Sequence, residues 1–369
     1  MRQVRSENGG PTTQERPPIL APNGIHVLGC REDVEARKIL EQYARSSFDS
    51  LKLWPPKSYF FSPFRRCVIA YAVANNIAIC LGDPVGPDIE IEMTAREFLK
   101  KCKKKRWGVA FYRTSADFLP VYRRLGLQKL KIGDDALVDL GQFSLNGRSK
   151  RDIRSKANHF QQLGMRVVEY QPPLASETLA QLTNVEEQWL TIPGRRERTF
   201  AVGHFDQGYL RATPVLAVID CDGKIFAFVN VISANPGEIA GDVMRRSRDA
   251  PNGITDYLLL KLIQYAREKR CNRVSLGLAP MTGFKEGESA RLEERVINGV
   301  LRKLDFLFRF RGLSLYKAKF ATSSEPRYLI YENLLQLPRA ALALVRLSEI
   351  KDRESLVRRS YQTLTNSSP

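Results

Sequence analysis

The same order of predicted elements occurs twice along this chain, and that repeat limits the fold more than any other feature. Each block contains two apolar runs separated by a turn signal, Asn75-Asn76 in the first block and Asp222-Gly223 in the second, which indicates a hairpin. Helical periodicity and a further short strand follow each hairpin. The predicted strands lie at 67–73, 77–81, 107–112, 136–140, 167–168, 214–219, 225–232, 239–244 and 274–278, and the predicted helices at 94–106, 117–125, 149–163, 176–190 and 254–266.

Hairpins combined with crossover helices indicate mixed sheets flanked by helices, an α/β (α+β) fold built as two similar halves. We therefore expect a flexible leader at 1–24, a first domain at 25–146 and a second domain at 147–332. The last segment, 333–369, is predicted to be a basic amphipathic helix and tail. A helix of that kind either lies on an anionic membrane or packs on the body of the protein.

Charge indicates the kind of partner. The 369 residues carry a net charge of +18, which favours a polyanion, either nucleic acid or an anionic membrane surface. A soluble protein with a repulsive surface is the alternative. Six cysteines without CxxC spacing and only three histidines argue against a metal site, a disulfide framework or a Ser-His-Asp triad. No apolar run reaches the ~20 residues of a membrane span, so we expect a cytoplasmic protein.

The first stretch that contains candidate catalytic residues is 241–246, at the end of a predicted strand. On a regular strand Asp242, Met244 and Arg246 share one face, whereas Arg245 lies on the other. A bulge at the strand end could bring Asp242 and Arg245 to one cleft. The alternative is an ordinary surface ion pair.

A second stretch, 312–320, contains Lys317 and Lys319, which are predicted to lie side by side on one strand face. Two adjacent lysines repel each other unless an anion lies near them, so a phosphate or a developing oxyanion is the expected partner. Solvated lysines on an edge strand are the alternative.

Two further stretches are charged and helical. Glu294 and Arg295 lie in one of them, which taken alone is an ordinary exposed helix face. The other places Arg151, Arg154 and Asn158 on one side of a basic helix, an arrangement that suits phosphate contacts.

Many short motifs then occur in a fixed order. They are Gly82-Asp83-Pro84, Lys131, Gly133, Asp139-Leu140, Phe143, the basic helix at 147–158, Glu197-Arg198, Gly203-His204-Phe205, Tyr209-Leu210, Asp242 to Arg245, Gly277, Pro280, Glu294-Arg295, Gly312-Leu313, Lys317 to Phe320 and Arg327-Tyr328-Leu329. In that order they resemble the catalytic domain of the bacterial aminoacyl-phosphatidylglycerol synthases, the multiple peptide resistance factors. The resemblance covers about residues 30 to 335.

The resemblance implies a tandem pair of acetyltransferase-like (GNAT) folds with two mixed sheets. It implies transfer of an amino acid, usually Lys or Ala, from aminoacyl-tRNA to the glycerol hydroxyl of phosphatidylglycerol, without metal, coenzyme A or other cofactor. The chain departs from the family at 254–258 and 321–326, and we expect no counterpart of the family's multi-span N-terminal region. We therefore expect peripheral association with the inner face of the cell membrane, partly through 334–359.

By motif position, Asp242 is assigned to the ammonium group of the donor and Arg245 to phosphate or ribose. Lys317 is assigned to the oxyanion or the lipid phosphate, and Glu294 to orienting the donor, with Arg295 beside it. The expected substrate contacts are Arg151, Arg154, Asn158, Arg246, Arg295, Lys319 and Arg327. Two alternatives remain open: transfer to another hydroxylated lipid or to a peptidoglycan peptide, and a tRNA- or membrane-binding module without catalysis.

Overall fold

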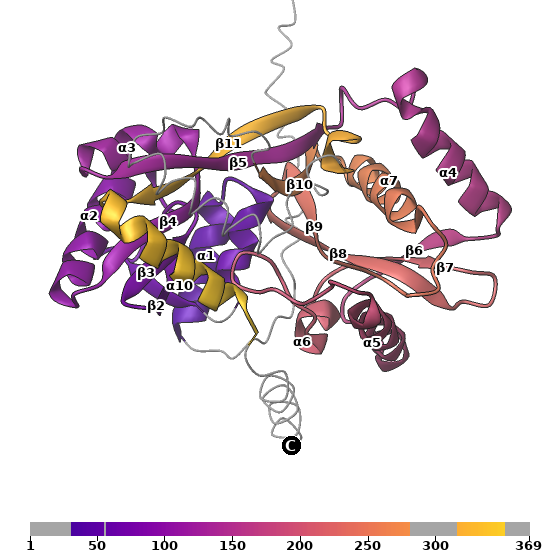
Figure 1. The fold of residues 1–369 in the computed structure, drawn as a ribbon, viewed down its shortest axis with the longest axis horizontal. Helices are drawn as coiled ribbons and strands as arrows, with labels where there is room; N and C mark the ends of the chain where they lie inside the picture. Colours follow the sequence, from indigo (N-terminus) through magenta and orange to yellow (C-terminus); the bar gives the residue numbers. More distant parts are fainter. Residues whose placement is uncertain (1–30, 55–56, 281–315, 351–369) are drawn as a thin grey trace, which may run out of the picture.

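A computed structural model describes residues 31–54, 57–280 and 316–350, and these form one 11-stranded mixed sheet with helices on both faces (Figure 1). The strand order is β1-β2-β3-β4-β11-β5-β10-β9-β8-β7-β6. The strands are β1 (Ser58–Phe61), β2 (Val68–Ala74), β3 (Ile77–Leu81), β4 (Gly108–Ser115), β5 (Gln128–Asp139), β6 (Arg166–Tyr170), β7 (Val215–Ile219), β8 (Ile225–Asn235), β9 (Glu238–Arg246), β10 (Arg273–Pro280) and β11 (Ser323–Tyr331).

Eight α-helices are described, together with four short 3-10 helices. The α-helices are α1 (Arg31–Tyr43), α2 (Asp88–Lys104), α3 (Leu119–Arg124), α4 (Arg151–Gln162), α5 (Ser176–Thr191), α6 (Gln207–Arg211), α7 (Ile254–Glu268) and α10 (Leu337–Ser348). The 3-10 helices are η1 (Ser47–Leu53), η2 (Ala116–Phe118), η3 (Arg148–Lys150) and η4 (Leu334–Gln336). The predicted α/β class is confirmed, and so are both predicted hairpins.

The two halves are joined by exchanged strands. From one edge the sheet runs from β1 to β4 and then meets β11, the last strand of the second half. From the other edge it runs from β6 to β10 and then meets β5, the last strand of the first half. Strand β11 pairs with β4 and β5, and β5 pairs with β11 and β10. The expected two sheets are therefore one. Strand β11 lies in the expected second domain, 147–332, yet it pairs with β4 and β5 of the first half, and sequence order does not reveal such pairing.

Each half contains one pair of parallel strands that separates toward its carboxyl end. In the first half β3 and β4 pair from Ile77↔Gly108 to Leu81↔Tyr112. In the second half β9 and β10 pair only from Glu238↔Arg273 to Ala240↔Ser275. Ligands of open α/β sheets bind outside the carboxyl ends of the strands, so these two positions are where substrate sites are expected.

Helices α2 and α3 cover one face of the first half, and α4 and α7 cover the same face of the second (Figure 1). The opposite face packs against α5, α6 and α10. Helix α10 lies on β2 and β3 through its buried side chains, Leu337, Ala340, Ala341, Ala343 and Leu344. Of the two alternatives for this segment, packing on the protein is therefore correct for 337–348. The remainder of the tail, like the leader at 1–24, lies outside the described residues.

Candidate active site at the end of strand β9

The predicted bulge is present in β9. Val229 of β8 faces Met244, and Val231 faces Gly241, so Asn230 alone faces both Asp242 and Val243. The Asn230 side-chain oxygen accepts a hydrogen bond from the backbone N–H of Val243 at 2.7 Å and so stabilises the extra residue. Because a bulge shifts the alternation of side chains by one residue, Asp242 and Arg245 both face α5 and α6.

The Asp242 carboxylate is fixed by two donors from the segment before and within α6. The backbone N–H of Gly203 donates to Oδ1 at 2.8 Å, and the Tyr209 hydroxyl donates to Oδ2 at 2.8 Å. A Cβ atom on residue 203 would lie 1.9 Å from Oδ2, so only glycine fits there. Burial raises the pKa of Asp242 above its usual value, whereas these two hydrogen bonds oppose the rise.

Aromatic rings and a lysine complete what we call the Asp242 cluster. Trp54 of the segment after η1 stacks near Tyr209, with ring centroids 4.2 Å apart, and its indole N–H donates to His204 Nδ1 at 3.1 Å. Lys57 donates to the Trp54 carbonyl oxygen at 2.7 Å, and burial lowers the pKa of this lysine to about 7 even though Asp242 is nearby. The sequence analysis missed Lys57 and Trp54, because they lie almost 190 residues from Asp242.

Arg245 lies between two carboxylates. Its Nε donates to Glu186 of α5 at 2.5 Å, and its Nη2 lies 3.3 Å from Glu197 Oε1. The guanidinium also stacks over the Trp189 ring at 4.1 Å. Glu197 in turn accepts from the backbone N–H of Phe205, two residues beyond Gly203. This network fixes the loop that holds Asp242, and Arg245 is only 9% exposed.

The prediction that Lys317 and Lys319 share a strand face is wrong, because residues 316–318 form a helical turn. The backbone N–H groups of Phe320 and Ala321 both bond to the Lys317 carbonyl at 3.0 Å, which winds the chain and points the two lysines apart. Lys319 lies 3.7 Å from Asp256 of α7. The alternating pattern alone could not separate a strand from a single turn.

Lys317 points to the separated end of β10. Its Nζ donates to the Leu278 carbonyl oxygen at 2.7 Å. Burial, reinforced by repulsion from Arg113, lowers the pKa of Lys317 to about 7, while Asp135 opposes that shift. Lys317 therefore interacts electrostatically with residues of the first half of the protein.

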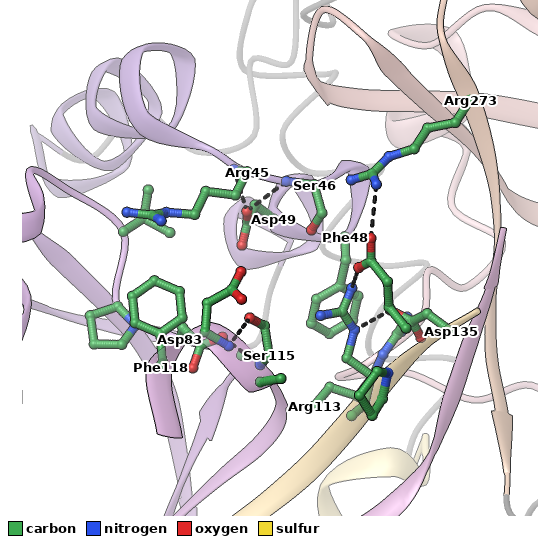
Figure 2. A pocket seen from close by; sticks show the side chains of 18 residues that line it. Arg45, Ser46, Phe48, Asp49, Asp83, Arg113, Ser115, Phe118, Asp135 and Arg273 are labelled. Atoms are coloured by element: carbon green, nitrogen blue, oxygen red, sulfur yellow. Dashed lines mark hydrogen bonds and ion pairs between the residues drawn. The ribbon is translucent and has the colours of Figure 1, made fainter. Parts of the chain in front are cut away.

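Arg327 belongs to a separate pocket of about 460 Å³ at the end of β3 and β4 (Figure 2). Its Nε donates to Asp135 Oδ2 at 2.6 Å, and Arg113 of β4 donates to Oδ1 of the same carboxylate at 2.8 Å. Arg327 is thus buried among ion pairs in the first half and does not join the Asp242 cluster.

The remaining predicted residues are dispersed. On α4, Arg151 and Asn158 are exposed, and Arg154 donates to the Gly147 carbonyl oxygen at 2.9 Å. Arg246 lies beyond the bulge, and its guanidinium donates to the Ser247 carbonyl oxygen at 3.2 Å. Glu294 and Arg295 lie outside the described residues. Among the side chains that are described, no cluster of three or more potential metal ligands occurs.

Fold and site together define a duplicated α/β domain with a buried carboxylate where a parallel strand pair separates. The family described as phosphatidylglycerol lysyltransferase, C-terminal, matches residues 37–331, and the chain belongs to that family. The resemblance found in the sequence is thereby confirmed.

Named relatives agree with this assignment. The chain is 29% identical over 296 residues to the phosphatidylglycerol lysyltransferase of Staphylococcus haemolyticus. The alignment covers 80% of this chain and 35% of that protein. The Bacillus subtilis phosphatidylglycerol lysyltransferase is also 29% identical, over 74% of this chain and 32% of its own length. The chain therefore spans about a third of these curated relatives.

Solved structures give the same result. The structure of L-PGS from Bacillus licheniformis superposes with a TM-score of 0.77 at 28% identity, and the match covers 85% of this chain and 95% of that one. FemX shares the fold alone, with a TM-score of 0.54 at 10% identity. In the described part of this chain no helix is long and apolar enough to cross a membrane.

Proposed function

We propose that this chain is an aminoacyltransferase that moves Lys or Ala from aminoacyl-tRNA to the glycerol hydroxyl of phosphatidylglycerol. The observation that carries the proposal is the Asp242 cluster, a buried carboxylate oriented by Gly203 and Tyr209 within a family of phosphatidylglycerol lysyltransferases. The reaction is a transesterification, in which a lipid hydroxyl attacks the aminoacyl ester and the ribose hydroxyl leaves.

Asp242 is suited to hold the ammonium group of the donor. A buried carboxylate is costly without a positive partner, and the raised pKa of Asp242 reports that cost. The adjacent Trp54 and Tyr209 rings provide the aromatic faces that cations favour. Arg245, occupied by two carboxylates, is better suited to positioning this loop than to the direct phosphate or ribose contact expected from sequence.

The attack needs a proton acceptor and a positive group for the tetrahedral oxyanion. Lys57 has a pKa of about 7 and lies beside Asp242, so its neutral form is available to take the proton from the attacking hydroxyl. Lys317 projects at the separated end of β10 and in its protonated form supplies the positive charge. Loss of one oxyanion donor costs on the order of 3 kcal/mol in the transition state.

tRNA is a polyanion and a phosphatidylglycerol bilayer presents an anionic surface, and the net charge of +18 favours both. Arg151 and Asn158 are exposed on α4, at the outer edge of the second half (Figure 1), and are available to tRNA phosphates. For the lipid, Leu335 and Leu342 are 87% and 54% exposed beside the exposed Arg339 and Arg346. We propose that this surface of η4 and α10 contacts the inner face of the membrane.

The test mixes purified protein, phosphatidylglycerol vesicles and tRNA charged with radiolabelled Lys or Ala, followed by lipid extraction. Label in the lipid phase is the expected result and names the donor. If label is transferred only when another hydroxylated lipid or a peptidoglycan peptide is supplied, that molecule is the acceptor in place of phosphatidylglycerol. tRNA binding that ignores the charging state, with no transfer to any acceptor, would leave the binding-module alternative.

A further inference from the structure

The short sequence Gly-Asp occurs at the same place in both halves of the sheet. In β3 the last residue paired to the parallel neighbour is Leu81, and Gly82-Asp83 follow directly. In β9 the last such residue is Ala240, and Gly241-Asp242 follow directly. Asp83 is therefore the counterpart of Asp242 in the duplicated fold.

The two carboxylates are also held in the same way. Asp83 accepts a hydrogen bond from the Tyr122 hydroxyl at 2.9 Å and another from the backbone N–H of Ser115 at 2.8 Å. One tyrosine hydroxyl and one backbone N–H fix Asp242 likewise. Burial raises the pKa of Asp83 to about 6. A carboxylate that is costly to bury and accurately oriented in both copies indicates a function in both.

Asp83 opens into a pocket, and the proposed function leaves that pocket without a role. Figure 2 shows Asp83 between Arg45 and Phe118 on one side and Arg113 and Asp135 on the other. The volume of the pocket, about 460 Å³, falls in the range of small-ligand sites. The pocket is thus large enough for a polar headgroup.

The lining carries five carboxylates, which accept from ligand hydroxyl groups, and four guanidinium groups, which suit an anion: Asp49, Asp83, Asp117, Asp135 and Glu325, with Arg45, Arg113, Arg273 and Arg327. Each Asp83 oxygen has a lone pair left after its internal hydrogen bond, which suits a ligand hydroxyl. Arg113 Nε is buried and has no hydrogen-bond partner among the described residues. Arg45 stands over the Phe118 ring, and its carboxylate partner Asp88 is 84% exposed, so the guanidinium can turn to an anion at low cost.

We propose that the Asp83 pocket is a second substrate site, the duplicate of the Asp242 site, and that it takes a glycerol phosphodiester. In this arrangement a glycerol hydroxyl donates to Asp83, and the phosphate lies against Arg45 and Arg113. The assignment of this ligand to the acceptor, the phosphatidylglycerol headgroup, rests on the proposed function. Lys317 couples electrostatically to Arg113 and Asp135, which links the pocket to the proposed oxyanion group.

The test measures binding to the full chain by calorimetry, with glycerophosphoglycerol, inorganic phosphate and phosphatidylglycerol vesicles as separate probes. Asp83→Asn keeps the shape of the side chain, and Arg45→Ala truncates a half-exposed side chain. Arg96→Ala is the matched control, because Arg96 is similarly exposed and pairs with Glu92 on α2. The Kd for glycerophosphoglycerol should rise about tenfold in either pocket variant and stay unchanged in the control.

Unchanged binding in both pocket variants would overturn the proposal, as would inorganic phosphate binding as tightly as glycerophosphoglycerol. Binding of the vesicles alone, equal in wild type and variants, would also overturn it and would place the lipid contact elsewhere. Transfer with an unchanged KM for the lipid in both variants would refute the pocket but not the proposed function. Absence of transfer, with binding that depends on Asp83, would refute the proposed function but not the pocket.

Discussion

Gly203→Ala is the substitution with the most direct structural consequence. The added Cβ would lie 1.9 Å from Asp242 Oδ2 and 3.0 Å from Tyr209 Cε1, on the same side as both hydrogen bonds to the carboxylate. Contacts below 3.0 Å do not occur in practice, so the carboxylate must retreat by about 1 Å. That displacement lengthens a hydrogen bond of 2.8 Å beyond the usual limit of about 3.2 Å.

The magnitude follows from those two bonds. A hydrogen bond to a charged group is worth about 1.5–3 kcal/mol, so the loss of one or two should cost about 3 kcal/mol in donor and transition-state binding. We therefore expect kcat/KM to fall about 100-fold. The melting temperature should change little, because position 203 does not require a positive φ and the added methyl group meets only the site.

The assay is transfer of label from aminoacyl-tRNA to lipid, measured beside a thermal melt. Gly141→Ala is the matched control, since position 141 is exposed and its Cβ would meet only Asp139 Oδ1, at 3.3 Å. A Gly203→Ala protein with kcat/KM within twofold of wild type would show that the orientation of Asp242 is not needed. A large fall in melting temperature would show that the substitution acts through the fold.

The remaining predictions concern the pH dependence of the site, tRNA binding and membrane contact. Tyr209→Phe removes a hydrogen bond that lowers the pKa of Asp242, so the loss of aminoacyl-donor binding on the acid side should move to higher pH; an unmoved binding profile would contradict the role of Asp242. Lys317→Ala should lower kcat about 100-fold. Because the pKa of Lys317 is about 7, wild-type kcat/KM should decline above neutral pH, whereas Lys317→Arg should extend it upward; the pH profiles decide. Arg151→Ala should weaken tRNA binding and reduce its salt slope by about one, as measured by filter binding at several salt concentrations. Leu342→Ser should reduce flotation with anionic liposomes without lowering the melting temperature, and undiminished flotation would refute membrane contact through α10.

The choice of a surface variant for that last measurement follows from the packing of α10. A chain truncated after Glu332 would lose Leu337 and Leu344, which are almost fully buried against β2 and β3. Weak flotation of such a chain would then report unfolding. Substitution of the exposed leucines separates membrane contact from stability.

The sequence by itself determined the features that depend on neighbouring residues. Asn75-Asn76 fixed one hairpin, Asp222-Gly223 fixed the other, and the spacing of leucines from 254 to 266 fixed α7, because turn chemistry and helical periodicity are local. The motif order also identified the family. The bulge that brings Asp242 and Arg245 to one face was foreseeable for the same reason, since one extra residue reverses the alternation of a strand.

Only the tertiary structure decided what depends on distant partners. Whether 316–320 is a strand or a turn depends on the chain around it, and alternating residues fit both. The exchange of β5 and β11 joins the halves through pairing across almost 200 residues, which no local pattern records. Lys57 interacts electrostatically with Asp242 because η1, which precedes it, packs on β8 and β9. Asp83 repeats the geometry of Asp242 because the fold is duplicated, and burial, which the sequence does not display, shifts the pKa values of Lys57 and Asp83.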